Sequence, residues 1–180
     1  MLQFKIQGRG GQGVLKAAEI LAEAFFREGK YIQAYATYGG ARRGTPVSSF
    51  VRVDDKPIRL RCDIENPDVI VCFDPSLLTD TLLKGAAEGT SVLINSANSP
   101  AHYAALGNFK VVTVDAIAIA YANELGRIVN TILVGAFAGL LKSPGSDILV
   151  RVIREKSPAM VEQNVKAFLA GFRSVTGGMN

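Results

Sequence analysis

The alternation of apolar and polar residues near the N-terminus predicts a strand, a turn and a helix. Apolar side chains at positions 2, 4 and 6 alternate with polar ones, as in a half-buried strand. From Val14 to Phe25 apolar residues recur at helical spacing, and charged residues mark the opposite stripe. Between the two patterns lie four glycines, namely Gly8, Gly10, Gly11 and Gly13.

The remaining pattern alternates strands with helices. We expect strands at 31–37, 47–54, 58–62, 69–73, 91–94 and 109–114. We expect helices at 75–84, 116–125, 131–141, 146–156 and 158–172. The strands 47–54 and 58–62 flank a short polar turn, so we expect them to form an antiparallel hairpin. The chain is therefore predicted to be one α/β domain over 1–180, a Rossmann-like three-layer α/β/α fold with a mixed, mostly parallel sheet.

The glycine turn has the chemistry of a phosphate site. Glycine allows a ligand to approach bare backbone, and a helix N-terminus offers unpaired N–H groups with a partial positive charge. Gly8, Gly10 and Gly13 also fit the dinucleotide pattern G-x-G-x-x-G. That pattern requires an acidic residue about 20 residues later to hold a ribose, and the strand 31–37 has none. An ordinary NAD site is therefore not expected. The alternative is that the glycines only allow a strand and a helix to pack closely.

Polar residues in and near the glycine turn are candidate ligand contacts. Arg42 and Arg43 lie in a glycine-containing loop after the second strand, where a guanidinium can pair with a phosphate. The same pair could instead contact a partner subunit or solvent. Arg9 could contact a phosphate or another subunit, and Gln12 could donate to a ligand or cap the helix.

Composition narrows the class of protein. The 180 residues are 48% hydrophobic and 20% charged, with a net charge of +4. The basic residues are scattered, which does not favour nucleic acid. The longest apolar run, 131–141, is shorter than the ~20 residues of a membrane span. We expect a soluble, cytoplasmic protein that binds neither nucleic acid nor membrane.

The remaining reactive residues are interpreted as structural. Two cysteines, Cys62 and Cys72, are expected to be buried thiols in strands, and they are too few to hold a four-cysteine iron–sulfur cluster. His102 has no visible catalytic partner. Gly135 and Gly139 are expected to allow a close helix contact, in the core or at a subunit face.

Four motifs carry a resemblance to a known family. They are Gly8-Arg9-Gly10-Gly11-Gln12-Gly13, Arg42-Arg43-Gly44-x-Pro46 with the strand Phe50-Val51-Arg52, Pro67-Asp68-Val69-Ile70-Val71 leading to Asp74, and Asn130-Thr131-Ile132-Leu133-Val134-Gly135-Ala136. In order, over roughly 4–172, they resemble the gamma subunit of 2-oxoacid:ferredoxin oxidoreductases, most closely the pyruvate type.

The resemblance implies a function. Enzymes of this family oxidatively decarboxylate a 2-oxoacid with thiamine diphosphate, coenzyme A and iron–sulfur clusters, and pass electrons to ferredoxin. It implies that this chain helps to hold coenzyme A. The anion site predicted from the residues fits the phosphates of coenzyme A, with these binding residues: Gly8, Arg9, Gly10, Gly11, Gln12, Gly13, Arg42 and Arg43. Thiamine diphosphate, Mg and the clusters would belong to alpha, beta and delta-type partner subunits. No catalytic or metal-binding residue is assigned to this chain.

Two other functions remain open at this point. A free-standing oxidoreductase could bind NADP, with Arg42 or Arg43 on its 2′-phosphate. A pure assembly subunit would use the glycine turn for packing alone.

Overall fold

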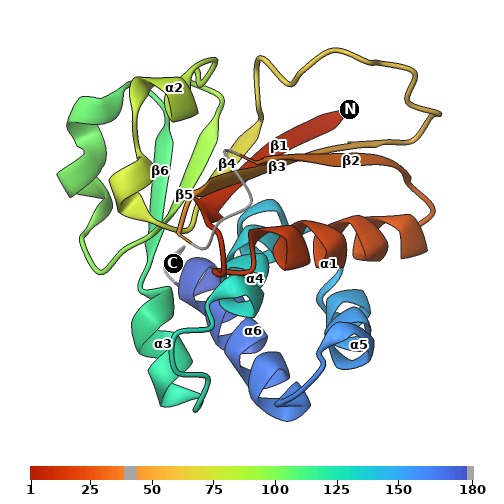
Figure 1. Cartoon of the computed structure of the whole chain (residues 1–180), viewed down its shortest axis with the longest axis vertical. Helices are drawn as coiled ribbons and strands as arrows, with labels where there is room; N and C mark the ends of the chain where they lie inside the picture. The colour runs from red at the N-terminus through yellow and green to blue at the C-terminus, as the bar shows by residue number, and fades with distance from the viewer. Residues whose placement is uncertain (39–43, 178–180) are drawn as a thin grey trace.

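The computed structural model describes residues 1–38 and 44–177. A six-stranded sheet in the order β2-β3-β1-β4-β5-β6 forms its centre (Figure 1). The strands are β1 (Leu2–Arg9), β2 (Tyr31–Tyr38), β3 (Pro46–Asp54), β4 (Val69–Cys72), β5 (Ser91–Asn95) and β6 (Lys110–Val114). β1, β4, β5 and β6 run parallel, whereas β3 is antiparallel to both β1 and β2. The predicted mixed, mostly parallel α/β sheet is therefore confirmed.

Helices cover both faces of the sheet, unequally. The larger layer contains α1 (Val14–Arg27), α3 (Ala116–Ala122), α4 (Asn130–Leu141), α5 (Ser146–Lys156) and α6 (Val161–Thr176). The opposite face carries the short helix α2 (Asp80–Leu83) and the 3₁₀ segments η1 (Pro75–Leu77) and η2 (Pro100–Leu106). Phe4 of β1 and Phe137 of α4 meet in the larger core, with ring centroids 4.7 Å apart. The N-terminal strand is thus fixed to the central helix.

α4 and α6 approach each other at backbone distance. A Cβ atom added to Gly135 would lie 2.1 Å from the Phe168 carbonyl oxygen, and one added to Gly171 would lie 2.1 Å from the Ile132 carbonyl oxygen. Real side chains do not come so close, so both positions require glycine. The expected close helix contact around Gly135 therefore lies in the core.

Two predicted elements were wrong. The segment 58–62 is not a strand, because β1 and β2 already occupy both edges of β3. β3 instead pairs with β2, the strand that precedes it. The predicted helix 75–84 is two short pieces, η1 and α2, separated by Leu78 in an extended conformation (φ −70°, ψ 92°). The Thr79 side chain then begins α2 by accepting a hydrogen bond from the Leu82 N–H.

Arg52 explains where the segment after β3 goes. Its side chain, only 1% exposed, lies on the sheet face opposite α1. It donates to the Gln3 and Gln33 side-chain oxygens at 3.0 and 2.6 Å, and to the Cys62 carbonyl at 2.8 Å. The segment 55–68 is thereby held across this face. Cys62 is exposed and irregular, so its prediction as a buried strand residue was wrong.

Candidate functional site

The glycine turn connects the central strand β1 to α1, at the edge of the sheet where the parallel strands end. A Cβ atom on Gly8 would lie 2.7 Å from Val14 Cγ2 and 2.8 Å from Phe73 Cβ, so close packing of strand and helix requires this glycine. Gly11 and Gly13 have φ of 96° and 84°, in the left-handed region that glycine adopts readily. Close packing therefore explains why residue 8 is glycine. The left-handed backbone of the turn explains why residues 11 and 13 are glycine.

Hydrogen bonds close the turn onto the end of the β2–β3 connection. The Gly10 N–H donates to the Thr45 carbonyl at 2.8 Å, and the Gly44 N–H donates to the Gly10 carbonyl at 3.1 Å. Gln12 Oε1 accepts from the Arg9 N–H at 2.7 Å. The Gln12 side-chain oxygen is thus used within the turn and does not cap α1.

The first N–H groups of α1 have no hydrogen-bond acceptor within residues 1–38 and 44–177. Gly13 is its N-cap, and no described side chain caps the helix. The N–H groups of Val14, Leu15 and Lys16 precede the first hydrogen bond of the helix, which runs from the Ala17 N–H to the Gly13 carbonyl at 2.9 Å. These N–H groups, with the positive end of the helix dipole, make this the part of the turn best able to hold an anion.

A depression of about 310 Å³ lies at this helix terminus. It is lined by Arg9, Gly10, Gly11, Gly13, Val14, Leu15, Lys16 and Val47. Lys16 brings a cation to its rim, where its Nζ also lies 3.0 Å from Glu19 Oε2. From the sequence, Lys16 was assigned only to the polar stripe of α1. Its position in the first turn of the helix was the signal that it could also help to bind an anion.

Arg9 is engaged within the chain. Its Nε donates to Asp74 Oδ2 at 2.7 Å, one terminal nitrogen donates to Ser76 Oγ at 2.8 Å, and the other donates to the Gly44 carbonyl at 3.1 Å. One side chain thus joins the ends of β1 and β4 to the start of β3. The sequence indicated Asp74 only as a cap, and its Oδ1 does accept from the Ser76 N–H at 3.0 Å.

The environment of Asp74 favours its ionised form. Partial burial alone would raise the pKa of this carboxyl, but hydrogen bonds from Ser76 and from Arg9 outweigh burial and lower it. Asp74 is therefore a carboxylate at neutral pH, and it holds the Arg9 guanidinium in place.

Asn130, the first residue of α4, contacts the glycine turn. A Cβ atom on Gly13 would lie 3.0 Å from both Asn130 Cβ and Asn130 Nδ2. Asn130 Oδ1 is buried and has no hydrogen-bond partner among the described residues. The N-terminal ends of α1 and α4 therefore meet here, which sequence spacing could not indicate because the two residues are far apart in the chain.

Arg42 and Arg43 lie outside the described residues. The residues that follow them, Gly44 and Thr45, are hydrogen-bonded to Gly10 of the turn. The base of the loop that carries the arginine pair is therefore attached to the turn that the sequence identified as the anion site.

Other candidate groups are structural. Burial raises the pKa of the Cys72 thiol to about 12, so it stays protonated, and its prediction as a buried strand thiol is confirmed. Within 1–38 and 44–177 there is no group of three or more His, Cys, Asp or Glu side chains that could hold a metal ion. Among the helices of the described residues, none is both long enough and apolar enough to cross a membrane.

Comparison with known proteins identifies the family. Residues 3–174 match the model of the pyruvate ferredoxin/flavodoxin oxidoreductase family. The chain belongs to this family. It is 42% identical over 175 residues to the common gamma subunit of the pyruvate and ketoisovalerate oxidoreductases of Thermococcus kodakarensis, covering 93% of each chain. It is thus a gamma-type subunit of an oxidoreductase complex, as its motifs indicated.

Solved structures agree with this assignment. The pyruvate oxidoreductase subunit PORC of Thermotoga maritima superimposes with a TM-score of 0.86 at 30% identity, covering 96% of this chain and 95% of that chain. The fold also occurs within a longer chain, the 2-oxoglutarate:ferredoxin oxidoreductase of Magnetococcus marinus, whose structure contains 2-oxoglutarate, coenzyme A and succinyl-CoA. That match has a TM-score of 0.81 and 18% identity, and it covers 99% of this chain but 31% of that one.

Proposed function

We propose that this gamma subunit contributes to coenzyme A binding and to assembly of a pyruvate:ferredoxin oxidoreductase, which converts the 2-oxoacid to acyl-CoA. The observation that carries the proposal is the depression at the start of α1, where unused backbone N–H groups and Lys16 converge. Coenzyme A carries a diphosphate and a 3′-phosphate, which are the anions that such a site favours. The relatives' names, which specify pyruvate or ketoisovalerate, support a 2-oxoacid substrate.

The phosphates divide between two parts of the site. The diphosphate lies against the turn from Gly10 to Gly13 and the first N–H groups of α1. The 3′-phosphate lies by Arg42 or Arg43, whose loop ends at Gly44 beside the turn. Gly8 and Arg9 shape the turn rather than touch the ligand, because Gly8 packs against Val14 and Phe73 and the Arg9 guanidinium pairs with Asp74. Gln12 uses its Oε1 within the turn, and its Nε2 can donate to the ligand.

The other cofactors belong to other subunits in this proposal. Thiamine diphosphate, Mg and the iron–sulfur clusters reside on alpha, beta and delta-type partners, and ferredoxin is reached through the complex. The chain acts as one gamma-type domain and has no oxidoreductase activity alone. The Magnetococcus marinus structure contains coenzyme A in an enzyme that includes this fold, which supports a role for coenzyme A here.

The experiment is a Lys16→Gln substitution in the reconstituted complex, with apparent KM measured for coenzyme A and for pyruvate. Lys166→Gln on α6 is the matched control, since this exposed lysine is absent from the residues lining the depression. The proposal expects Lys16→Gln to raise the KM for coenzyme A severalfold, with the KM for pyruvate unchanged. An unchanged KM for coenzyme A would favour a pure assembly subunit. The hydrogen bonds that Gly10 and Gln12 form within the chain also suit that function, because a turn used only for packing needs no ligand.

A further inference from the structure

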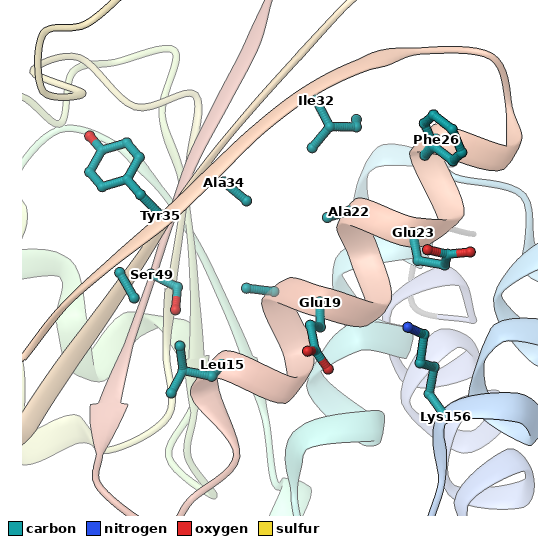
Figure 2. A pocket seen from close by; sticks show the side chains of 12 residues that line it. Leu15, Glu19, Ala22, Glu23, Phe26, Ile32, Ala34, Tyr35, Ser49 and Lys156 are labelled. Carbon is teal, nitrogen blue, oxygen red and sulfur yellow. The ribbon is translucent and has the colours of Figure 1, made fainter.

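An apolar groove runs along α1, starting beside the glycine turn at Leu15. It has a volume of about 410 Å³ and runs between α1 and the edge strand β2. Figure 2 shows Ile32 and Ala34 of β2 facing Ala22 of α1 across it, with Leu15 and Phe26 at opposite ends. Alanines on both walls leave the space open.

The apolar residues of the groove are unusually accessible. Phe26 is 67% exposed and Leu15 is 41% exposed, although both belong to a helix whose inner face is buried. At the floor, Ser49 is only 2% exposed, and its Oγ has no hydrogen-bond partner among the described residues. A buried hydroxyl without a partner indicates that an interaction is missing. Both features are typical of a surface that is covered in its functional state.

β2 offers a free backbone edge beside the groove. In the part of the chain that the structure describes, it is the outermost strand of the sheet and pairs only with β3. Its eight residues, Tyr-Ile-Gln-Ala-Tyr-Ala-Thr-Tyr, include no charged residue and no proline. Proteins normally protect a long edge strand with one of these residues or with a covering segment. An unprotected edge next to an apolar groove suits an added strand, because backbone pairing and side-chain pockets then act together.

The charges at the rim indicate what the added segment carries. Glu19 and Glu23 are already paired with Lys16 and Arg27, respectively. Lys156, at the end of α5, forms no ion pair within the described residues. Arg27 is shared between Glu23 and Glu155, so the three carboxylates at the rim are balanced by Lys16, Arg27 and Lys156. The complementary occupant of an apolar groove with balanced charges is an apolar segment.

The length of the groove agrees with a peptide segment. Leu15 and Phe26 are separated by eleven helical steps of about 1.5 Å, or roughly 16 Å along α1. An extended chain of about five residues at about 3.3 Å each spans that distance. Relatives of this chain are named as subunits of oxidoreductases, so a partner subunit is a natural source of such a segment.

We infer that the groove between α1 and β2 receives an extended, apolar segment of a partner subunit of the same oxidoreductase, which pairs with β2 as an additional strand. This inference rests on the assembly part of the proposed function and specifies the surface that serves it. It is independent of coenzyme A binding, because the groove and the anion depression share only Leu15 among their lining residues.

The decisive measurement is amide hydrogen exchange over β2, in the isolated chain and in the reconstituted complex. The outward-facing amides of 31–37 should exchange rapidly in the isolated chain and become at least tenfold slower in the complex. Unchanged exchange in a complex that has assembled would overturn the inference while leaving assembly intact. Protection that instead rises with the concentration of the isolated chain would assign the groove to a second copy and also overturn it.

Matched variants test the same surface without disturbing the core. Phe26→Ser should weaken binding of the partner subunits by tenfold or more, since an exposed aromatic in an interface is a typical hot spot. Tyr121→Ser on α3 removes an aromatic that is 61% exposed elsewhere and should leave binding unchanged. Ala34→Arg in the groove should also weaken binding, whereas Ala118→Arg on α3 should not. Equal effects within each pair would contradict the inference. Failure of the wild-type chain to assemble at all would instead contradict the proposed function.

Discussion

Arg9 Nε donates to Asp74 Oδ2 at 2.7 Å, which joins the end of β1 to the segment after β4. The same guanidinium donates to the carbonyl of Gly44, at the start of β3. Three segments that meet at the candidate site are therefore tied by one side chain. Arg9 positions the glycine turn relative to the loop that carries Arg42 and Arg43, and this arrangement leaves the N-terminus of α1 open to a ligand.

The Arg9–Asp74 pair should contribute measurably to stability. A hydrogen bond to a charged group contributes about 1.5–3 kcal/mol, and partial exposure of this pair reduces that to about 1–2 kcal/mol. We expect Arg9→Ala and Asp74→Asn each to lower the free energy of unfolding by about that amount in urea titrations. In a double-mutant cycle the two effects should be strongly non-additive. Additive losses would show that the two side chains do not act together.

The same pair predicts a pH dependence. The folded-state pKa of Asp74 is lowered, so its contribution is complete above the unfolded-state pKa of about 3.9 and is lost as pH falls through the lower folded value. The destabilisation caused by Asp74→Asn should therefore be largest near pH 7 and should shrink toward pH 3. Urea unfolding across this range measures it, and a pH-independent difference would argue against an ionised Asp74.

Gly13 should be less tolerant of a side chain than another glycine in the same conformation. Gly13 and Gly29 have φ of 84° and 79°, so an alanine at either is strained to the same degree. Only at Gly13 would the new Cβ meet Asn130, at 3.0 Å, whereas at Gly29 nothing lies within 4 Å. Gly13→Ala should therefore cost on the order of 1 kcal/mol more than Gly29→Ala. Equal losses in thermal unfolding would exclude the Asn130 contact as a constraint.

The α4–α6 contact predicts a severe core variant. Gly135→Ala would place a methyl group 2.1 Å from the Phe168 carbonyl oxygen, so the two helices would have to separate. We expect a loss of about 2–4 kcal/mol or failure to fold. Gly89→Ala is the control, because its added Cβ would have no neighbour within 4 Å. Comparable stability of the two variants would mean that the helices can separate freely.

Local patterns predicted most of the fold. Alternation in β1 and helical spacing in α1 depend only on neighbouring residues, so both elements were found, as was α5 with its bounds at 146 and 156. The segment 58–62 alternates as well as a true strand does, but β1 and β2 already pair with both sides of β3, the strand it was expected to join. Its position is set by the buried Arg52, whose partners lie far apart in the sequence. Pairing partners of this kind cannot be seen from periodicity.

The sequence predicted where the candidate site lies, but it did not predict most of the side-chain contacts that build it. The glycines and the helix start identified the turn, because backbone conformation and the helix dipole follow from local sequence. Asp74, Ser76 and Asn130 reach the turn only through the tertiary fold. Lys16 could have been noticed, since a lysine in the first helical turn lies beside any anion bound there.

The isolated chain should be inactive. In the proposed division of labour, the reacting cofactors belong to other subunits. Pyruvate- and coenzyme-A-dependent reduction of ferredoxin or a viologen should be undetectable with the purified chain and should appear when the partner subunits are added. Robust turnover by the chain alone would refute this division.

The central claim is that this chain reads the phosphates of coenzyme A, and discrimination between coenzyme A and dephospho-coenzyme A tests it most directly. The measurement is the ratio of kcat/KM for the two thiols in the reconstituted complex, for the wild type, Arg42→Ala and Arg43→Ala. Loss of a charged hydrogen bond of about 1.5–3 kcal/mol corresponds to roughly 10- to 150-fold. The account predicts a wild-type ratio of that order, which collapses toward one when the reading arginine is removed. A ratio that stays constant across all three proteins would contradict the account.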